Sequence, residues 1–239
     1  MRENQFVRVD RSEALIGPNH PMASLFGKVF GAALGNSDHV ARSGVSSGFY
    51  FNFDKIYQDP TLDKTEIETF HKELAQLVEG YVRQRHATCL GLLFPNHGPV
   101  GVVQLRSALA ERLSVPTIVI HTGERLLRHQ IEFEQTGSLS PAFLLKQDAR
   151  IMLLSDAATS GASIYKGALV ARKFGATCTD ALVLFDRMQG AKEWLAIKHI
   201  SIIPILDRRF FERRPDPRVQ IVPDRQASRL EFESVSATI

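Results

Sequence analysis

Apolar positions in residues 88–206 fall into short continuous runs that alternate with helical patterns. The runs are rich in Val, Ile and Leu, which is typical of strands buried on both faces of a parallel sheet. The stretches between them carry apolar residues at helical spacing. The pattern therefore predicts an α/β fold with a doubly wound, mainly parallel, five-stranded sheet flanked by helices. The predicted strands are 88–94, 115–121, 150–156, 178–186 and 200–206.

Outside this alternation the pattern changes. Residues 1–87 combine a helical stretch at about 20–34, a Gly/Ser-rich turn before the aromatic run FYFNF, and a long amphipathic helix at 66–86. The polar segment 122–138 has no clear period, and we expect no strand partner for it. We therefore expect three parts, which are an N-terminal hood subdomain at 1–87, an α/β core at 88–206 and a partly irregular C-terminal extension at 207–239.

Composition narrows the class of protein. The net charge is only +3, so non-specific binding to nucleic acid is not implied. No run reaches the roughly 18 apolar residues that a membrane helix needs, and the first residues are polar, without the apolar core of a signal peptide. Cys89 and Cys178 lie inside apolar runs, which predicts buried, reduced thiols. We expect a cytoplasmic protein that binds neither nucleic acid nor membrane.

The stretch IMLLSDAATSGASIY, residues 151–165, carries the most distinctive loop chemistry. A carboxylate, Asp156, ends a strand, and a turn of small residues opens the next helix. Backbone N–H groups in such a turn, together with the positive end of the helix dipole, favour an anion. Hydroxyl groups add donors, Gly161 would let the backbone approach a ligand, and Asp156 could orient a sugar hydroxyl or a metal-bound water. The alternative is that Ser or Thr merely caps the helix.

The carboxyl ends of parallel strands share one edge of a sheet, and ligands bind beyond that edge. The loops after residues 94, 121, 156 and 186 should therefore meet at one rim.

The segment that runs from Ser155 to Ser163 resembles the phosphoribosyl-pyrophosphate (PRPP) signature of type I phosphoribosyltransferases. In that family two acidic residues contact the ribose hydroxyls, and the turn cradles the 5′-phosphate. The first acidic position is Ser155 here, whereas Asp156 keeps the second and is implied to be catalytic. The resemblance implies a PRPP site made of Ser155, Asp156, Ala157, Ala158, Thr159, Ser160, Gly161, Ala162 and Ser163, with His97 and Gly98 from the first loop.

Two more segments resemble orotate phosphoribosyltransferases in particular. ARSGVSSGFYFN is similar to the N-terminal segment that covers the pyrimidine ring, and LVLFDRMQGA is similar to the strand-Asp-Arg element on the orotate side. The resemblance implies base contacts from Arg42, Tyr50, Phe51 and Arg187. From the residues alone, Tyr50 and Phe51 would pack in the core, Arg187 would pair with Asp186 on the surface, and Arg42 would be solvated.

The pyrophosphate side departs from the family pattern. His97 stands where the family has lysine, while Gly98 remains. An ungapped match places the family's mobile catalytic loop at 121–127, with Arg125 in place of the catalytic lysine. Losing one well-placed electrostatic donor costs about 10²–10³ in rate, so binding is better supported than turnover.

The resemblance implies transfer of the 5-phosphoribosyl group of PRPP to orotate or a similar pyrimidine-like base. It also implies Mg²⁺ bound through PRPP and a homodimer. The alternative is a catalytically impaired PRPP- or nucleotide-binding protein with a sensor or regulatory role. A third reading assigns the Arg-rich tail to nucleic acid, but Glu212 and Asp216 interrupt its charge and no recognition helix accompanies it.

Overall fold

The computed structural model describes residues 14–35, 39–40, 46–47, 50–93, 100–120, 131–133 and 149–213. Within these ranges the backbone alone is described for residues 35, 39–40, 46–47, 50, 100–102, 131–133 and 213.

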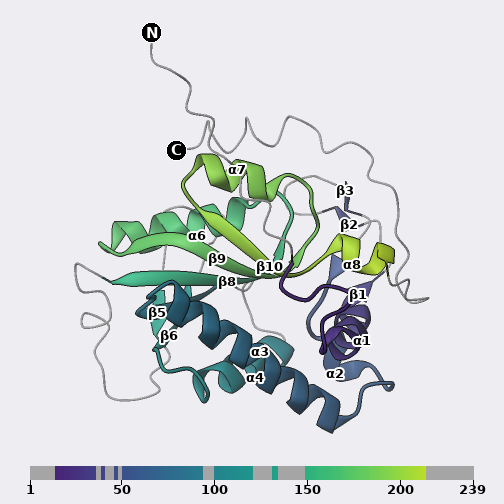
Figure 1. Ribbon diagram of the computed structural model, residues 1–239. Coiled ribbons are helices and arrows are strands. Elements are labelled where there is room, and N and C mark those ends of the chain that lie inside the picture. Colours follow the sequence, from purple (N-terminus) through teal and green to yellow (C-terminus); the bar gives the residue numbers. More distant parts are fainter. Residues whose placement is uncertain are drawn as a thin grey trace.

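A six-stranded sheet forms the centre of the molecule, with the strand order β10-β9-β8-β5-β6-β7 (Figure 1). The first five strands in this order pair in parallel, which confirms the predicted fold class. The strands are β5 (Cys89–Leu93), β6 (Thr117–Ile120), β7 (Ile131–Phe133), β8 (Arg150–Ala158), β9 (Thr177–Asp186) and β10 (Ser201–Asp207).

Strand β7 corrects one sequence-based expectation. Residues 122–138 were expected to lack a strand partner, but Ile131 and Phe133 lie opposite Ile120 and Ile118 in an antiparallel pair with β6. Ile-Glu-Phe is too short to show a period within a polar segment. Its backbone partner is the free edge of β6, which the sequence of β7 itself does not reveal.

Helices cover both faces of the sheet (Figure 1). On one face lie α6 (Ala162–Lys173) and α7 (Ala191–Ile197). On the other lie α1 (Ala23–Ala33), α3 (Lys64–Gln84) and α4 (Val100–Ala110). Two short helices, α2 (Lys55–Gln58) and α8 (Arg208–Arg213), complete the set within the described ranges. None of the helices described is long and apolar enough to cross a membrane.

Successive side chains of each central strand belong in turn to two separate hydrophobic clusters, one on each face of the sheet. In β8, Met152 and Leu154 join the cluster under α1 and α3, whereas Ile151 and Leu153 join the cluster under α6. This two-sided burial explains why the strands read as continuous apolar runs. Cys89 and Cys178 belong to the α6 side, and burial raises the pKa of both thiols to about 12. Both are buried and unpaired, as predicted.

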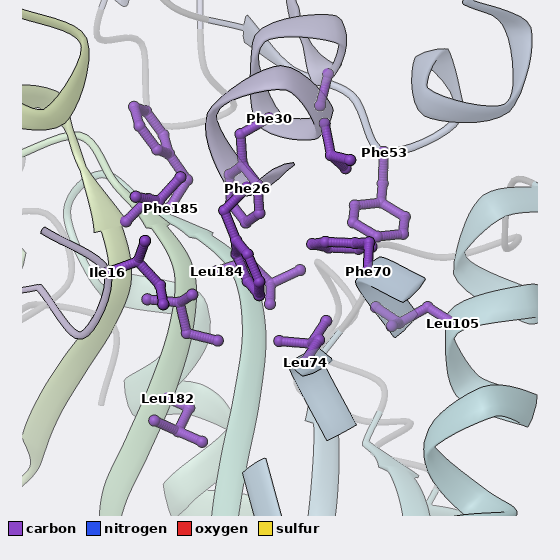
Figure 2. Close-up of a cluster of buried hydrophobic side chains, with 14 of the residues drawn as sticks. Ile16, Phe26, Phe30, Phe53, Phe70, Leu74, Leu105, Leu182, Leu184 and Phe185 are labelled. Atoms are coloured by element: carbon purple, nitrogen blue, oxygen red, sulfur yellow. The ribbon is translucent and has the colours of Figure 1, made fainter. Parts of the chain in front are cut away.

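Aromatic rings join the N-terminal elements to the sheet (Figure 2). Phe26 and Phe30 of α1 pack against Phe70 of α3, with ring centroids 5.1 and 5.9 Å away. Phe51 stacks on Phe185 of β9 at 5.8 Å. Edge-to-face and offset contacts of this kind each contribute about 0.5–1.5 kcal/mol beyond area burial. These N-terminal rings therefore share one hydrophobic cluster with the sheet, while the boundary at 87/88 stays a prediction.

The segment between α1 and α2 contains four two-residue strands. β1 (Leu34–Gly35) pairs with β4 (Tyr50–Phe51), and β2 (His39–Val40) pairs with β3 (Ser46–Ser47). Both pairs are antiparallel. The predicted aromatic strand is therefore present, although it is shorter than the FYFNF run.

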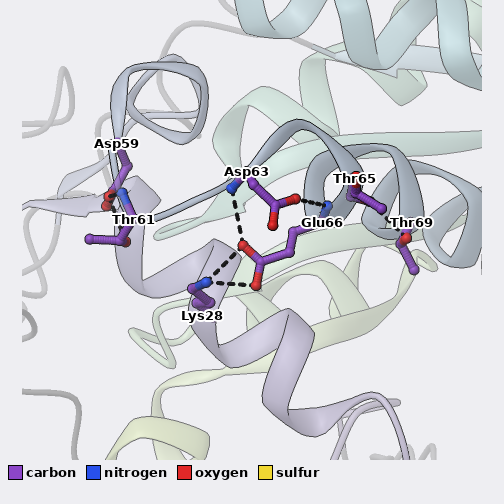
Figure 3. A network of polar contacts seen from close by, with 7 residues as sticks. All are labelled: Lys28, Asp59, Thr61, Asp63, Thr65, Glu66 and Thr69. Carbon is purple, nitrogen blue, oxygen red and sulfur yellow. Dashed lines mark hydrogen bonds and ion pairs between the residues drawn. The ribbon is translucent and has the colours of Figure 1, made fainter.

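Helix α3 begins at Lys64, two residues before the helix predicted at 66–86, because Asp63 caps it (Figure 3). The Asp63 carboxylate accepts the amide of Glu66 at 2.8 Å, and the Glu66 carboxylate accepts the amide of Asp63 at 3.1 Å. This reciprocal arrangement is a capping box. Glu66 also binds the Lys28 ammonium at 2.6 Å, which ties α3 to α1.

Candidate functional site

The order of the parallel strands locates the candidate site. In chain order the five strands lie as 2-1-3-4-5, so the direction of the crossovers reverses between β5 and β8. Ligands of open α/β sheets bind beyond the carboxyl ends of the strands at this point. The carboxyl end of β8 is the segment Ser155–Ala158, and it leads directly into α6. The structure therefore positions the Asp156 turn where a ligand is expected.

The turn after β8 presents backbone groups and small side chains. Gly161 is the N-cap of α6, with a left-handed φ of 78°. Having no side chain, it cannot cap the helix as Ser or Thr would. The only capping-type bond in this described turn is long, with the Ser160 hydroxyl accepting the amide of Ala162 at 3.4 Å. The first N–H groups of a helix lack intrahelical partners, so they are available to an anion.

Gly161 also brings α7 close to this turn. A Cβ atom at Gly161 would lie 2.7 Å from Cδ1 and 2.8 Å from Cγ of Leu195. The missing side chain therefore makes room for α7 as well as allowing the left-handed backbone. This reason for glycine differs from the close approach of a ligand that the sequence suggested.

Ser155 and Asp156 occupy different environments. Ser155 is only 2% exposed, and its hydroxyl lies 3.4 Å from both Oδ1 of Asp156 and the carbonyl oxygen of Ala157. Asp156 is partly exposed, and its Oδ1 accepts the amide of Ala157 at 2.7 Å. Burial raises the pKa of Asp156 to about 6, although that hydrogen bond and the charge of Arg187 oppose the rise. Asp156 is thus mostly an anion at pH 7.

The end of β9 adds a buried cation and a buried carboxylate. Arg187 and Asp186 are 6% and 5% exposed. The amide of Arg187 donates to the carbonyl of Ala158 at 3.0 Å, which fastens this segment to the start of the β8 turn. Oδ1 of Asp186 accepts the amide of Met188 at 2.8 Å. Arg187 is therefore buried beside the Asp156 turn rather than exposed on the surface.

The Asp186 carboxyl is strongly perturbed. Burial raises its pKa to about 6, with the Asp207 carboxylate adding to the rise and the Met188 amide opposing it. Asp207 is the residue opposite Asp186 in the β9–β10 register, is 4% exposed and forms an ion pair with Arg209. Sequence reasoning missed Asp207, although it ends a strand in the same way as Asp186.

Several residues implied by the resemblance lie elsewhere or outside the description. Phe51 is 5% exposed and packs on Phe185, so the structure gives it a role in the core, and its contact with a base stays a prediction. For Tyr50 only the backbone is described. Four further residues of the implied site lie outside the described residues, and these are Arg42, His97, Gly98 and Arg125.

Comparisons with known proteins agree with this arrangement. No family model matches the chain. Orotate phosphoribosyltransferase from Thermococcus kodakarensis is 25% identical over 179 residues, covering 75% of this chain and 86% of that protein. The enzyme of the same name from Thermococcus gammatolerans is 27% identical over 169 residues, covering 70% and 78%. The relatives thus match along most of both lengths.

Solved structures share the fold. The crystal structure of orotate phosphoribosyltransferase from Aeropyrum pernix matches with a TM-score of 0.56 and 24% identity, covering 81% of this chain and 98% of that one. The protein therefore has the fold of the type I phosphoribosyltransferases, and its sequence is similar to orotate phosphoribosyltransferases over most of its length.

Proposed function

We propose that the protein transfers the 5-phosphoribosyl group of PRPP to orotate or a similar flat, anionic base, with release of pyrophosphate. The observation that carries this proposal is the turn after β8, where a left-handed Gly161 opens α6 directly beyond the partly exposed carboxylate of Asp156. The named relatives support the same reaction class, and one matched structure of lower identity is a Mycobacterium tuberculosis orotate phosphoribosyltransferase in complex with PRPP (14% identity, TM-score 0.50).

The turn after β8 and the turn after β9 would bind different parts of the substrates. The N–H groups at the start of α6 would bind the 5′-phosphate, and Asp156 would accept a hydrogen bond from a ribose hydroxyl. The buried guanidinium of Arg187 would bind the anionic base, because a planar guanidinium matches a carboxylate or ring carbonyl. The C1–O bond to pyrophosphate breaks through an oxocarbenium-like state while a bond from C1 to the base nitrogen forms, and the proton of that nitrogen leaves to the pyrophosphate or to water.

Mg²⁺ is part of the proposal through PRPP. Mg²⁺ prefers oxygen ligands and is commonly held by one or two carboxylates together with substrate phosphates. Asp156 offers such a carboxylate at the turn. The described residues contain no group of three or more His, Cys, Asp or Glu that would hold a metal ion, so we assign most of the ligands to PRPP.

The pyrophosphate side of the site would come from residues outside the described ranges. We propose His97 and Gly98 as pyrophosphate contacts and Arg125 as the catalytic cation that stabilises the leaving group. We also propose Arg42, Tyr50 and Phe51 at the base, a homodimer, and a cytoplasmic location. These assignments depend on the family resemblance of the sequence.

A second candidate function is binding of PRPP or a nucleotide without turnover. The observation that favours it is Ser155, which stands at an acidic position of the PRPP signature and is only 2% exposed. A buried hydroxyl that already faces Asp156 and Ala157 is a poor replacement for a carboxylate. Such a protein would serve as a sensor or regulator.

One pair of measurements tests the proposal against this alternative. The protein is incubated with Mg²⁺-PRPP and orotate, then with other flat bases, and pyrophosphate release is followed while PRPP binding is measured by calorimetry. We expect binding together with orotate-dependent release. Binding without release for every base would favour the sensor. No binding of PRPP would reject the transferase, and no binding of PRPP or of a nucleotide would reject both functions.

A further inference from the structure

Met188 lies in the turn after β9, residues 187–190, and its side chain is unusually exposed. It follows two residues that are almost completely buried, yet its own side chain is 44% exposed. A large apolar side chain at the rim of a ligand site is a candidate for contact with the ligand. Exposure alone would not distinguish Met188 from Ile197, which is 71% exposed at the end of α7.

The backbone of Met188 supplies the distinguishing observation. Three non-glycine residues in the described ranges have left-handed φ, and these are His86 at 51°, His199 at 57° and Met188 at 59°. A residue with a Cβ atom adopts this conformation at a cost. Such strain persists where the surrounding structure holds it, and it concentrates at functional sites.

His86 and His199 have an ordinary explanation, because each follows the end of a helix. Their amides bind the carbonyls of Arg83 and Ala196, and the amide of the next residue binds one residue further back, as in a Schellman motif. Gly175 ends α6 in the same way. Met188 follows a strand instead, so no helix end accounts for its conformation.

The left-handed conformation of Met188 is held by Asp186. The buried carboxylate accepts the Met188 amide at 2.8 Å, and the amide of Arg187 is fixed to Ala158 at 3.0 Å. Two residues later Gly190, with a φ of 92°, begins α7, whose Leu195 packs on Gly161. The Met188 segment is therefore attached at both ends to the turn that would hold the phosphate.

We propose that Met188 is a specificity-determining residue, whose thioether packs against the ring of the acceptor base that Arg187 binds. The inference rests on the proposed function. A polarisable sulfur in contact with an aromatic ring is a favourable pairing, and the flexible methionine chain adapts to rings of slightly different shape. In this arrangement the Arg187 guanidinium binds the charged group of the flat base, and the Met188 thioether packs against the face of its ring.

The test compares three variants. Met188→Gly removes the side chain and the strain, Met188→Leu keeps an apolar side chain, and His199→Gly removes the same kind of strain at a helix end. Affinities for PRPP and for orotidine 5′-monophosphate, the nucleotide product, are measured by calorimetry, and folding is checked by denaturation.

We expect Met188→Gly to bind the nucleotide about two- to ten-fold more weakly, the range of a sulfur–aromatic contact, with PRPP affinity unchanged. Met188→Leu should recover part of the loss, and His199→Gly should match the unmodified protein in both affinities. As a second measurement, the nucleotide should slow peroxide oxidation of Met188 and leave Met152, which is 1% exposed, unchanged.

The outcomes separate the two proposals. Normal binding of PRPP and nucleotide in Met188→Gly, or equal weakening of both, would overturn the role of Met188 and leave the transferase proposal standing. Oxidation of Met188 at the same rate with and without nucleotide would also overturn it. A protein that binds neither ligand would reject the proposed function and this inference together.

Discussion

Two turns at the same edge of the sheet are built in opposite ways. Both connect a parallel strand to a helix on the same face, and both place a left-handed glycine at the N-cap, Gly161 before α6 and Gly190 before α7. The turn after β8 is made of small residues and offers backbone N–H groups. The turn after β9 is made of large side chains and offers Arg187 and Met188.

The difference lies in what holds each turn in place. The β8 turn depends on backbone shape, because Gly161 must be left-handed and must leave room for Leu195. The β9 turn depends on buried charge, because the Asp186 carboxylate holds the Met188 amide while Asp207 lies opposite. Backbone N–H groups suit an anion such as a phosphate, whereas a guanidinium beside an apolar side chain suits a ligand that carries both a charge and a ring.

The largest expected effect comes from breaking the backbone turn. Gly161→Ala adds a Cβ atom in a left-handed residue and directly against Leu195, so we expect a loss of about 3 kcal/mol in the free energy of unfolding. The measurement is denaturation by urea, with PRPP binding determined in parallel and expected to fall.

Gly175→Ala is the matched control for this change. Gly175 has a φ of 85°, but a Cβ atom there would meet nothing within 4 Å. Gly175→Ala should lower the free energy of unfolding only by the cost of a left-handed residue with a Cβ atom, about 1–2 kcal/mol. PRPP binding should stay unchanged. Equal losses of stability in the two variants would show that α7 does not press against the β8 turn.

The division of the substrate between the turns can be tested next. Asp156→Asn should weaken PRPP binding about 10- to 100-fold, the range expected when a charged hydrogen-bond partner is lost. Arg187→Ala should weaken binding of the base more than binding of PRPP. Calorimetry with PRPP and with the nucleotide measures both. Equal effects of Arg187→Ala on the two ligands would contradict its assignment to the base.

The sequence predicted the β8 turn far better than the β9 turn. Five parallel strands and the helix after Asp156 both follow from local patterns. The small-residue run predicts its turn because its conformation is encoded locally, in glycine and in short side chains. The one strand of the six-stranded sheet that was not predicted, β7, is too short for a pattern of its own and is defined by its pairing with β6.

The burial of Arg187 was not accessible from the sequence, and neither was the partner of Phe51, although core packing of Phe51 was the expectation from the residues alone. An arginine that follows a strand is ordinarily on the surface, yet Arg187 is buried where β8 and β9 end side by side. Phe51 was matched to the base, but the ring that stacks on it comes from Phe185, more than a hundred residues later. Pairings of this kind depend on tertiary packing, which the local pattern does not record.

The smallest expected effect concerns the buried charge of the β9 turn. Because the folded protein raises the pKa of Asp186 from 3.8 to about 6, the folded state binds more protons than the unfolded state between these values. Asp186 therefore stabilises the fold below pH 3.8 and loses this contribution as the pH rises through about 6. From pH 5 to pH 7 the loss should be about 1 kcal/mol.

Asp186→Asn isolates this contribution. The amide oxygen still accepts the Met188 amide, whereas the charge is gone, so this part of the pH dependence should disappear. The measurement is the free energy of unfolding at pH 5 and pH 7 for both proteins. Asp180→Asn is the control, because Asp180 is a carboxylate on the same strand that pairs with Arg85 at the opposite edge of the sheet. A pH dependence that persists unchanged in Asp186→Asn would mean that this carboxyl is not protonated on folding. The β9 turn would then be held by its backbone shape, as the β8 turn is.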